Sequence, residues 1–206
     1  KSGLYIRINE DGRIEKMVIG KERPEKDIDL YKWFRDRDYY SILIDMNKPV
    51  DPKKKIHSCN YFTLLIKKDI FPEVGENALS RSEFEERVNQ YFDILAEKEK
   101  KNTDKKLNEL MEYIPEKTDI SEIESKKNYI LSNIDFLTEE IKSEEFEGYV
   151  SLFFDADISM YEHECRKYLI SRIFNKNTFN EKFGSEIIGL SNYNMGSNDK
   201  KPYLEL

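Results

Sequence analysis

The sequence predicts an α+β fold in which a mixed or antiparallel sheet begins with an N-terminal β-hairpin and is interrupted by a central helical insertion. Two observations lead to this prediction. Helical periodicity fills the acidic middle of the chain, from Ser80 to about Lys142. Short stretches with the alternating or continuously apolar pattern of strands lie on both sides of it, at residues 3–9, 13–19, 61–67 and 149–154.

The N-terminal elements follow from local pattern. Residues 3–9 and 13–19 alternate apolar and polar around Asp11-Gly12, which is typical of a β-hairpin. A helix is expected to start near Asp27, with Leu30, Trp33 and Phe34 on one face.

Residues 61–67 are almost continuously apolar, which indicates a buried strand, and Pro72 and Gly75 then break the chain. We therefore expect residues 1–75 to form an N-terminal α+β unit that contains a basic loop.

The acidic insertion is assigned to residues 76–147. A capping box at Ser82–Glu85 predicts the start of its first helix, and a second cap at Ser121–Glu124 predicts a later one. A shorter helix between them is expected to stop at Pro115. The first and last helices carry apolar stripes composed of Phe84, Val88, Tyr91, Phe92 and Leu95, and of Tyr129, Ile130, Ile134, Leu137 and Ile141.

Residues 148–206 are expected to complete the α+β domain. Gly148 is followed by an aromatic-rich strand at 149–154, which we expect to share a sheet with 61–67. Asp157 or Ser159 then caps a helix that runs to about Phe174. A polar loop rich in Asn and Lys occupies residues 191–202.

The charge of the chain is unevenly distributed. Its net charge is −7, which by itself argues against binding to nucleic acid. Residues 48–68, however, hold six Lys against one Asp, and residues 165–203 carry a net charge of +4. The two basic segments flank a middle of net charge −9, so they could form one basic surface if they converge; otherwise they are ordinary solvated faces.

No apolar run approaches the roughly 20 residues of a membrane span. Abundant Lys and Glu, together with two separate cysteines, fit a reducing compartment, so we expect a cytoplasmic protein.

Acidic residues just after the predicted strand at 149–154 raise the question of catalysis. Asp155, Asp157, Glu162, His163 and Glu164 contain the residue types of a two-metal nuclease. Consecutive helical residues fan out by about 100°, however, so Glu162 to Glu164 cannot all face one ion. Zinc is disfavoured as well, because only one residue separates each His from the nearby Cys in His57-Ser58-Cys59 and His163-Glu164-Cys165. We therefore expect no catalytic residues, no bound metal and no cofactor.

Two loops are candidates for binding nucleic acid. The basic loop, residues 47–60, concentrates lysines between Pro49 and Pro52, which stiffen the backbone. A stiff basic loop suits contacts with phosphates, because little conformational entropy is lost on binding. In this loop the predicted contacts are Asn47, Lys48, Lys53, Lys54, Lys55, His57 and Asn60.

In the second loop, residues 191–202, the predicted contacts are Asn192, Asn194, Lys200 and Lys201. Asn amides pair well with base edges and Gly196 allows close approach of the backbone, although the same composition is also typical of a surface turn.

The run DMNKPVDPKKKIHSCNYFTLLIKK, together with Trp33–Tyr40, Gly189–Gly196 and Lys200–Glu205, resembles the N-terminal part of the large subunit of type I-B CRISPR Cascade complexes. The resemblance implies a non-catalytic antiviral-defence protein that binds near the 5′ handle of the crRNA. It also implies recognition of the protospacer-adjacent motif (PAM) in double-stranded target DNA, and partners that include other Cascade subunits and a recruited helicase-nuclease. The chain would then be a portion of a longer protein. The main alternative is a non-catalytic α+β scaffold that docks protein subunits; a metal-dependent nuclease is a weaker one.

Overall fold

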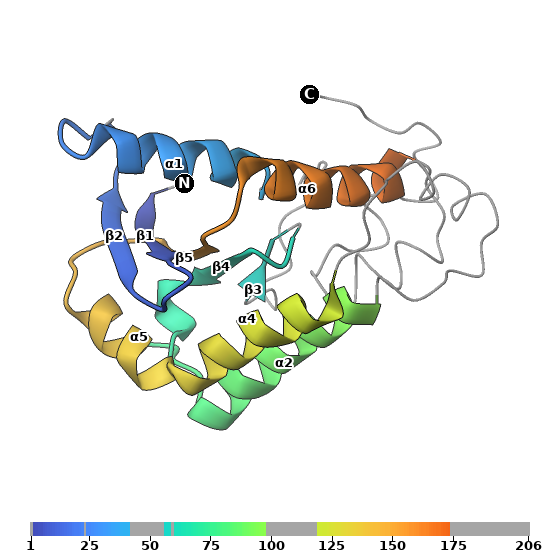
Figure 1. The fold of residues 1–206 in the computed structure, drawn as a ribbon. Helices are drawn as coiled ribbons and strands as arrows, with labels where there is room; N and C mark the ends of the chain where they lie inside the picture. The colour runs from blue at the N-terminus through green and yellow to red at the C-terminus, as the bar shows by residue number, and fades with distance from the viewer. Residues whose placement is uncertain (1, 23, 42–55, 59, 98–118, 174–206) are drawn as a thin grey trace, which may run out of the picture.

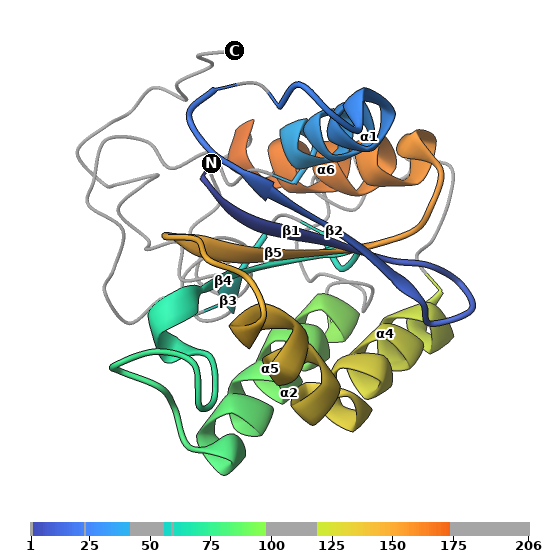
Figure 2. The same ribbon diagram turned by 90° about the vertical axis from the view of Figure 1, so that its left-hand side faces the viewer.

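The computed structural model describes residues 2–22, 24–41, 56–58, 60–97 and 119–173. In these ranges helices pack on both faces of one sheet, so the fold has three layers (Figure 1). Helices α1 (Ile28–Tyr39) and α6 (Ile158–Ile173) cover one face. Helices α2 (Arg81–Glu97), α4 (Ile120–Ser132) and α5 (Ile134–Lys142) cover the other (Figure 2).

The sheet has five strands in the order β2-β1-β5-β4-β3 and is mixed, which confirms the predicted fold class. Its strands are β1 (Gly3–Ile8), β2 (Ile14–Ile19), β3 (Ile56–His57), β4 (Thr63–Lys67) and β5 (Tyr149–Phe154). β1 and β2 form the predicted antiparallel hairpin, and β4 pairs antiparallel with β5, as expected for 61–67 and 149–154. β1 and β5 are parallel.

Two glycines allow β1 and β5 to approach each other closely where their parallel pairing begins. A side chain on Gly3 would overlap with the carbonyl group of Tyr149, its register partner. Gly148 has a φ of 95°, and a Cβ atom there would lie 2.7 Å from the carbonyl oxygen of Ser2. A side chain at either position would overlap with the neighbouring backbone, so glycine, which has no Cβ atom, is required.

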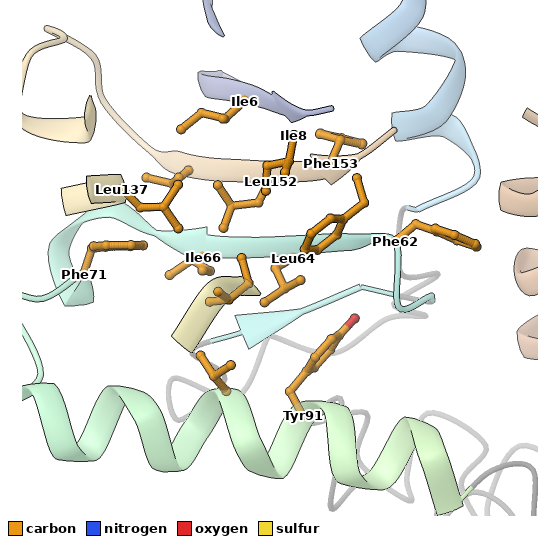
Figure 3. Close-up of a cluster of buried hydrophobic side chains, with 14 of the residues drawn as sticks. Ile6, Ile8, Phe62, Leu64, Ile66, Phe71, Tyr91, Leu137, Leu152 and Phe153 are labelled. Atoms are coloured by element: carbon orange, nitrogen blue, oxygen red, sulfur yellow. The ribbon is translucent and has the colours of Figure 1, made fainter. Parts of the chain in front are cut away.

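Side chains alternate between the two faces of the sheet. Phe153 and Tyr5 point towards α1, where both rings contact Phe34. The alternate positions of the strands face α2, α4 and α5 and form the larger apolar layer shown in Figure 3. Leu64, Leu152 and Ile6 in this layer are fully buried. One continuous cluster of buried side chains thus includes residues from the N-terminal unit, the helical insertion and the last strand.

Three details of the helices differ from the sequence predictions. The capping box of α2 is made by Ser80 and Glu83, because the Glu83 carboxylate accepts from Ser80 N at 3.0 Å and the helix begins at Arg81. In α4 the N-cap is Asp119, which accepts from Ser121 N at 2.8 Å. The expected single stripe from Tyr129 to Ile141 is divided at Asn133 between α4 and α5.

Asn133 interrupts the helix because its side chain competes for a backbone carbonyl group: Asn133 Nδ2 donates to Tyr129 O at 2.8 Å. The predicted helix that ends at Pro115 lies outside the described residues. None of the helices in the described ranges is long and apolar enough to cross a membrane.

Candidate functional site

The structure describes two of the eleven predicted nucleic-acid contacts. His57 lies in β3, where its backbone pairs with Leu65, and Asn60 follows it before β4. The other nine residues lie outside the described ranges: Asn47, Lys48, Lys53, Lys54, Lys55, Asn192, Asn194, Lys200 and Lys201. Their predicted roles therefore remain predictions.

For Asn60 the structure differs from the prediction of a nucleic-acid contact. Its side chain is fully buried and its amide group binds the protein itself. Asn60 Nδ2 donates to Tyr40 O at 3.2 Å and to Ser41 Oγ at 3.1 Å, and Asn60 Oδ1 accepts from Phe62 N at 2.9 Å. An amide whose donor and acceptor are both used internally does not read a base, so Asn60 is a structural residue.

Asn60 belongs to a buried polar group that we call the loop anchor, which consists of Ser41, Ser58, Asn60, Thr63 and Tyr91. Ser41 Oγ donates to Arg37 O at 2.8 Å and lies 2.9 Å from Thr63 Oγ1. Ser58 Oγ donates to Asn60 O at 3.1 Å and accepts from Asn60 N at 3.1 Å. Every residue of the loop anchor is at most 2% exposed.

Tyr91 connects the loop anchor to α2. Its hydroxyl lies 2.6 Å from Asn60 O and 3.1 Å from Thr63 O, and it can donate to either carbonyl group. Ser41 directly precedes segment 42–55 and Ser58 follows it shortly afterwards. The loop anchor therefore ties together the chain on both sides of the segment that holds the four clustered lysines.

Asp155, the first carboxylate of the nuclease alternative, is engaged in an ion pair. Arg7 Nη2 donates to Asp155 Oδ2 at 2.8 Å, and the Arg7 guanidinium lies 4.5 Å from the centre of the Trp33 ring. Arg37 lies 4.0 Å from the same ring and donates from Nη2 to Ala156 O at 2.7 Å. Burial lowers the pKa of Arg37, and the group as a whole packs the connection between β5 and α6 against α1.

The other acidic candidates do not converge with Asp155. Asp157 is exposed at the start of α6, whereas Glu164 is buried and Glu162 and His163 are half-buried. Within the described part of the chain, no three His, Cys, Asp or Glu side chains gather where they could hold a metal ion.

A crevice of about 450 Å³ opens where the parallel strands β1 and β5 end. It is lined by the turn of the β1–β2 hairpin, by α4, and by the connection from β5 to α6. Carboxyl ends of parallel strands are common ligand sites in sheets covered by helices. Of the residues that the structure describes, Lys126 is the one cation that lines it, and its side chain is only 15% exposed.

The environment of Lys126 is mostly aromatic. Its ammonium group lies 5.0 Å from the ring centre of Phe62 and 5.8 Å from that of Phe154, and Glu122 Oε2 is 3.4 Å away. Burial lowers the pKa of Lys126, although Glu122 opposes the shift. Sequence analysis did not select Lys126, but a signal was present, since it lies three residues after Ile123 and four before Ile130 on the buried stripe of α4.

The crevice and the loop anchor lie at the same end of the sheet. Phe62 lines the crevice and its amide donates to Asn60 of the loop anchor. Thr63, another anchor residue, pairs with Phe153 near the end of β5. No protein family, curated protein or solved structure matches the chain in comparisons with known proteins.

Proposed function

We propose that this chain is the N-terminal portion of the large subunit of a type I-B CRISPR Cascade complex. In that role it binds the crRNA near its 5′ handle and double-stranded target DNA, and it recognises the PAM without catalysing a reaction. Its partners are then other Cascade subunits and the helicase-nuclease that the complex recruits. The family assignment rests on the resemblance of residues 33–68 and 189–205.

The observation that carries the nucleic-acid role is the loop anchor. The buried hydrogen bonds of Asn60 and Ser41 fix the two flanks of segment 42–55 relative to each other. When both ends of a basic segment are fixed, fewer conformations are lost on binding, and phosphate contacts cost less entropy. This arrangement supports a phosphate-binding role for Lys48, Lys53, Lys54 and Lys55.

An overall charge of −7 is compatible with this role. In RNA-guided complexes, base pairing reads the target sequence, while the protein reads a short duplex motif and holds backbones. Few basic residues are then needed, and the acidic residues of 76–147 remain available for solvent or for protein partners.

Replacing Lys53, Lys54 and Lys55 with Ala tests the backbone contact. We expect weaker binding to every duplex and RNA strand, with the salt dependence reduced by about one unit per lost phosphate contact. The matched control replaces Lys21, Lys26 and Lys142, which removes the same charge elsewhere. Fluorescence anisotropy across a salt series measures both slopes. Equal slopes for the two triple variants would contradict the proposed contact.

PAM reading is assigned to the loop at residues 191–202. Asn192→Ala and Asn194→Ala should reduce discrimination between PAM and non-PAM duplexes by about 1–3 kcal/mol, the value of a good base contact. Lys200→Ala and Lys201→Ala should lower affinity for both kinds of duplex, because phosphate contacts position the protein without reading sequence. The measurement is binding to duplexes that differ only in the motif. If the Asn variants weaken all duplexes equally, this loop positions DNA and does not read it.

A further inference from the structure

Aromatic rings form part of the lining of the crevice at the ends of β1 and β5. The rings of Tyr129 and Phe154 meet edge to face, with centres 5.9 Å apart and planes at 82°. Tyr129 is held in place because its hydroxyl donates to Gly12 O at 2.9 Å. With Phe62 and Met160, these rings line a space of about 450 Å³. Such walls favour a planar ring, since aromatic faces stack on any flat π-system.

The charges of the crevice disfavour a phosphate group. Among the described residues, the carboxylates of Glu10, Glu122 and Asp155 and the ammonium group of Lys126 line it, and Asp155 is already paired with Arg7. A cationic side chain is the competing class of ligand, because the carboxylates outnumber the Lys126 ammonium group, although that group already lies over the Phe62 ring. The aromatic rings and the polar pair of Lys126 and Glu122 favour instead a neutral ring that offers both hydrogen-bond donors and acceptors.

Lys126 and Glu122 present a donor and an acceptor side by side, 3.4 Å apart on adjacent turns of α4. The Watson–Crick edge of a nucleobase carries adjacent acceptors and donors that match this pair. We propose that the crevice holds one unpaired nucleobase, and that bases with an exocyclic amino group are preferred. The preference follows from the carboxylates, which accept from amino groups and repel the two carbonyl oxygens of uracil or thymine.

This inference rests on the proposed function for the origin of the base. The crevice adjoins the loop anchor through Phe62, so a strand bound next to the loop anchor would have a base site within reach. The base can come from RNA or from DNA. Oligonucleotides of both kinds, (A)₁₂, (C)₁₂ and (U)₁₂ or (dT)₁₂, distinguish the two sources.

Free nucleosides test the crevice without any phosphate contact. Met160 lines the crevice, whereas Met17 lies in β2, so methyl-labelled methionine gives a local probe and an internal control. We expect adenosine and cytidine to shift the Met160 methyl NMR signal and leave that of Met17 unchanged. Uridine should bind about tenfold more weakly, as expected for loss of a hydrogen bond to a charged group. The Met160→Leu variant lacks the Met160 methyl signal and therefore assigns it.

Lys126→Met should weaken adenosine binding about tenfold, because the ammonium donor is removed while the stem is retained. Lys127→Met is the matched control: it removes the same charge from the adjacent residue, which pairs with Asp93 and Glu124 instead. Equal effects of the two substitutions, or no Met160 shift with any nucleoside, would overturn the proposal. A shift with N-acetyl-arginine amide but none with nucleosides would also overturn it and assign the crevice to a basic side chain of a protein partner.

The two proposals fail separately. If oligonucleotides bind with the expected salt dependence but nucleosides leave Met160 unmoved, the crevice is not a base site and the proposed function stands. If nucleosides shift Met160 but no oligonucleotide binds at any salt concentration, the crevice binds bases and the proposed function fails.

Discussion

Removing the Asn60 side chain tests whether the loop anchor stabilises the fold. Asn60→Ala takes away the acceptor of the buried Phe62 amide and one donor to Tyr40 O. Ser41 Oγ loses a donor as well, but it keeps its contacts with Arg37 O and Thr63. Each buried group left without a partner costs about 1–3 kcal/mol, so we expect the free energy of unfolding to fall by about 2–4 kcal/mol.

Asn133→Ala is the matched control, because that amide donates a single hydrogen bond, to Tyr129 O, and lies half-buried between α4 and α5. Its expected cost is about 0.5–1.5 kcal/mol. Urea unfolding monitored by circular dichroism and by fluorescence of Trp33, the only tryptophan, measures both variants. A loss below about 0.5 kcal/mol for Asn60→Ala, or one no larger than that of Asn133→Ala, would refute the reasoning.

Two further predictions concern the core and the crevice. Phe153→Ala should destabilise the protein by about 3–5 kcal/mol in the same assay, because the ring is fully buried. The control Phe136→Ala, at a site that is 42% exposed, should change the free energy of unfolding by less than about 1 kcal/mol. Burial lowers the pKa of Lys126 in the folded protein, so its charged form destabilises the fold at a pH below that pKa. This destabilisation disappears as the pH rises to the pKa of Lys126 in the unfolded chain, near 10.5. Lys126→Met should therefore gain stability relative to wild type at pH 7 and lose that advantage by pH 10.5; an advantage that grows with pH would contradict this.

Much of the fold could be predicted because its signals are local. The Asp11-Gly12 turn and the alternation around it specify the hairpin without reference to the rest of the chain. The parallel pairing of β1 with β5 could not be predicted, since register between distant strands depends on how the helices pack on both faces. The start of α2 was misplaced because Ser80-x-x-Glu83 and Ser82-x-x-Glu85 fit the same capping pattern.

The candidate site was less predictable than the fold. Asn60 belongs to a loop rich in polar residues, and nothing local indicates that its amide would turn inward to bind Tyr40 O and Phe62 N. Residue type suggested a surface contact, whereas the environment made it structural. The crevice was missed for a similar reason, because its walls come from four segments that meet only in the folded chain.

The pairing of β1 with β5 has a consequence for how the protein folds. These two strands are neighbours at the middle of the sheet, yet nearly the whole described chain separates them, which gives the fold a high contact order. During synthesis the β1–β2 hairpin must wait until Phe154 has left the ribosome before its inner edge is covered. A two-stranded hairpin is marginally stable alone, and its open edge can pair with other chains. Synthesis should therefore pass through a stage prone to aggregation, in which chaperones are most useful.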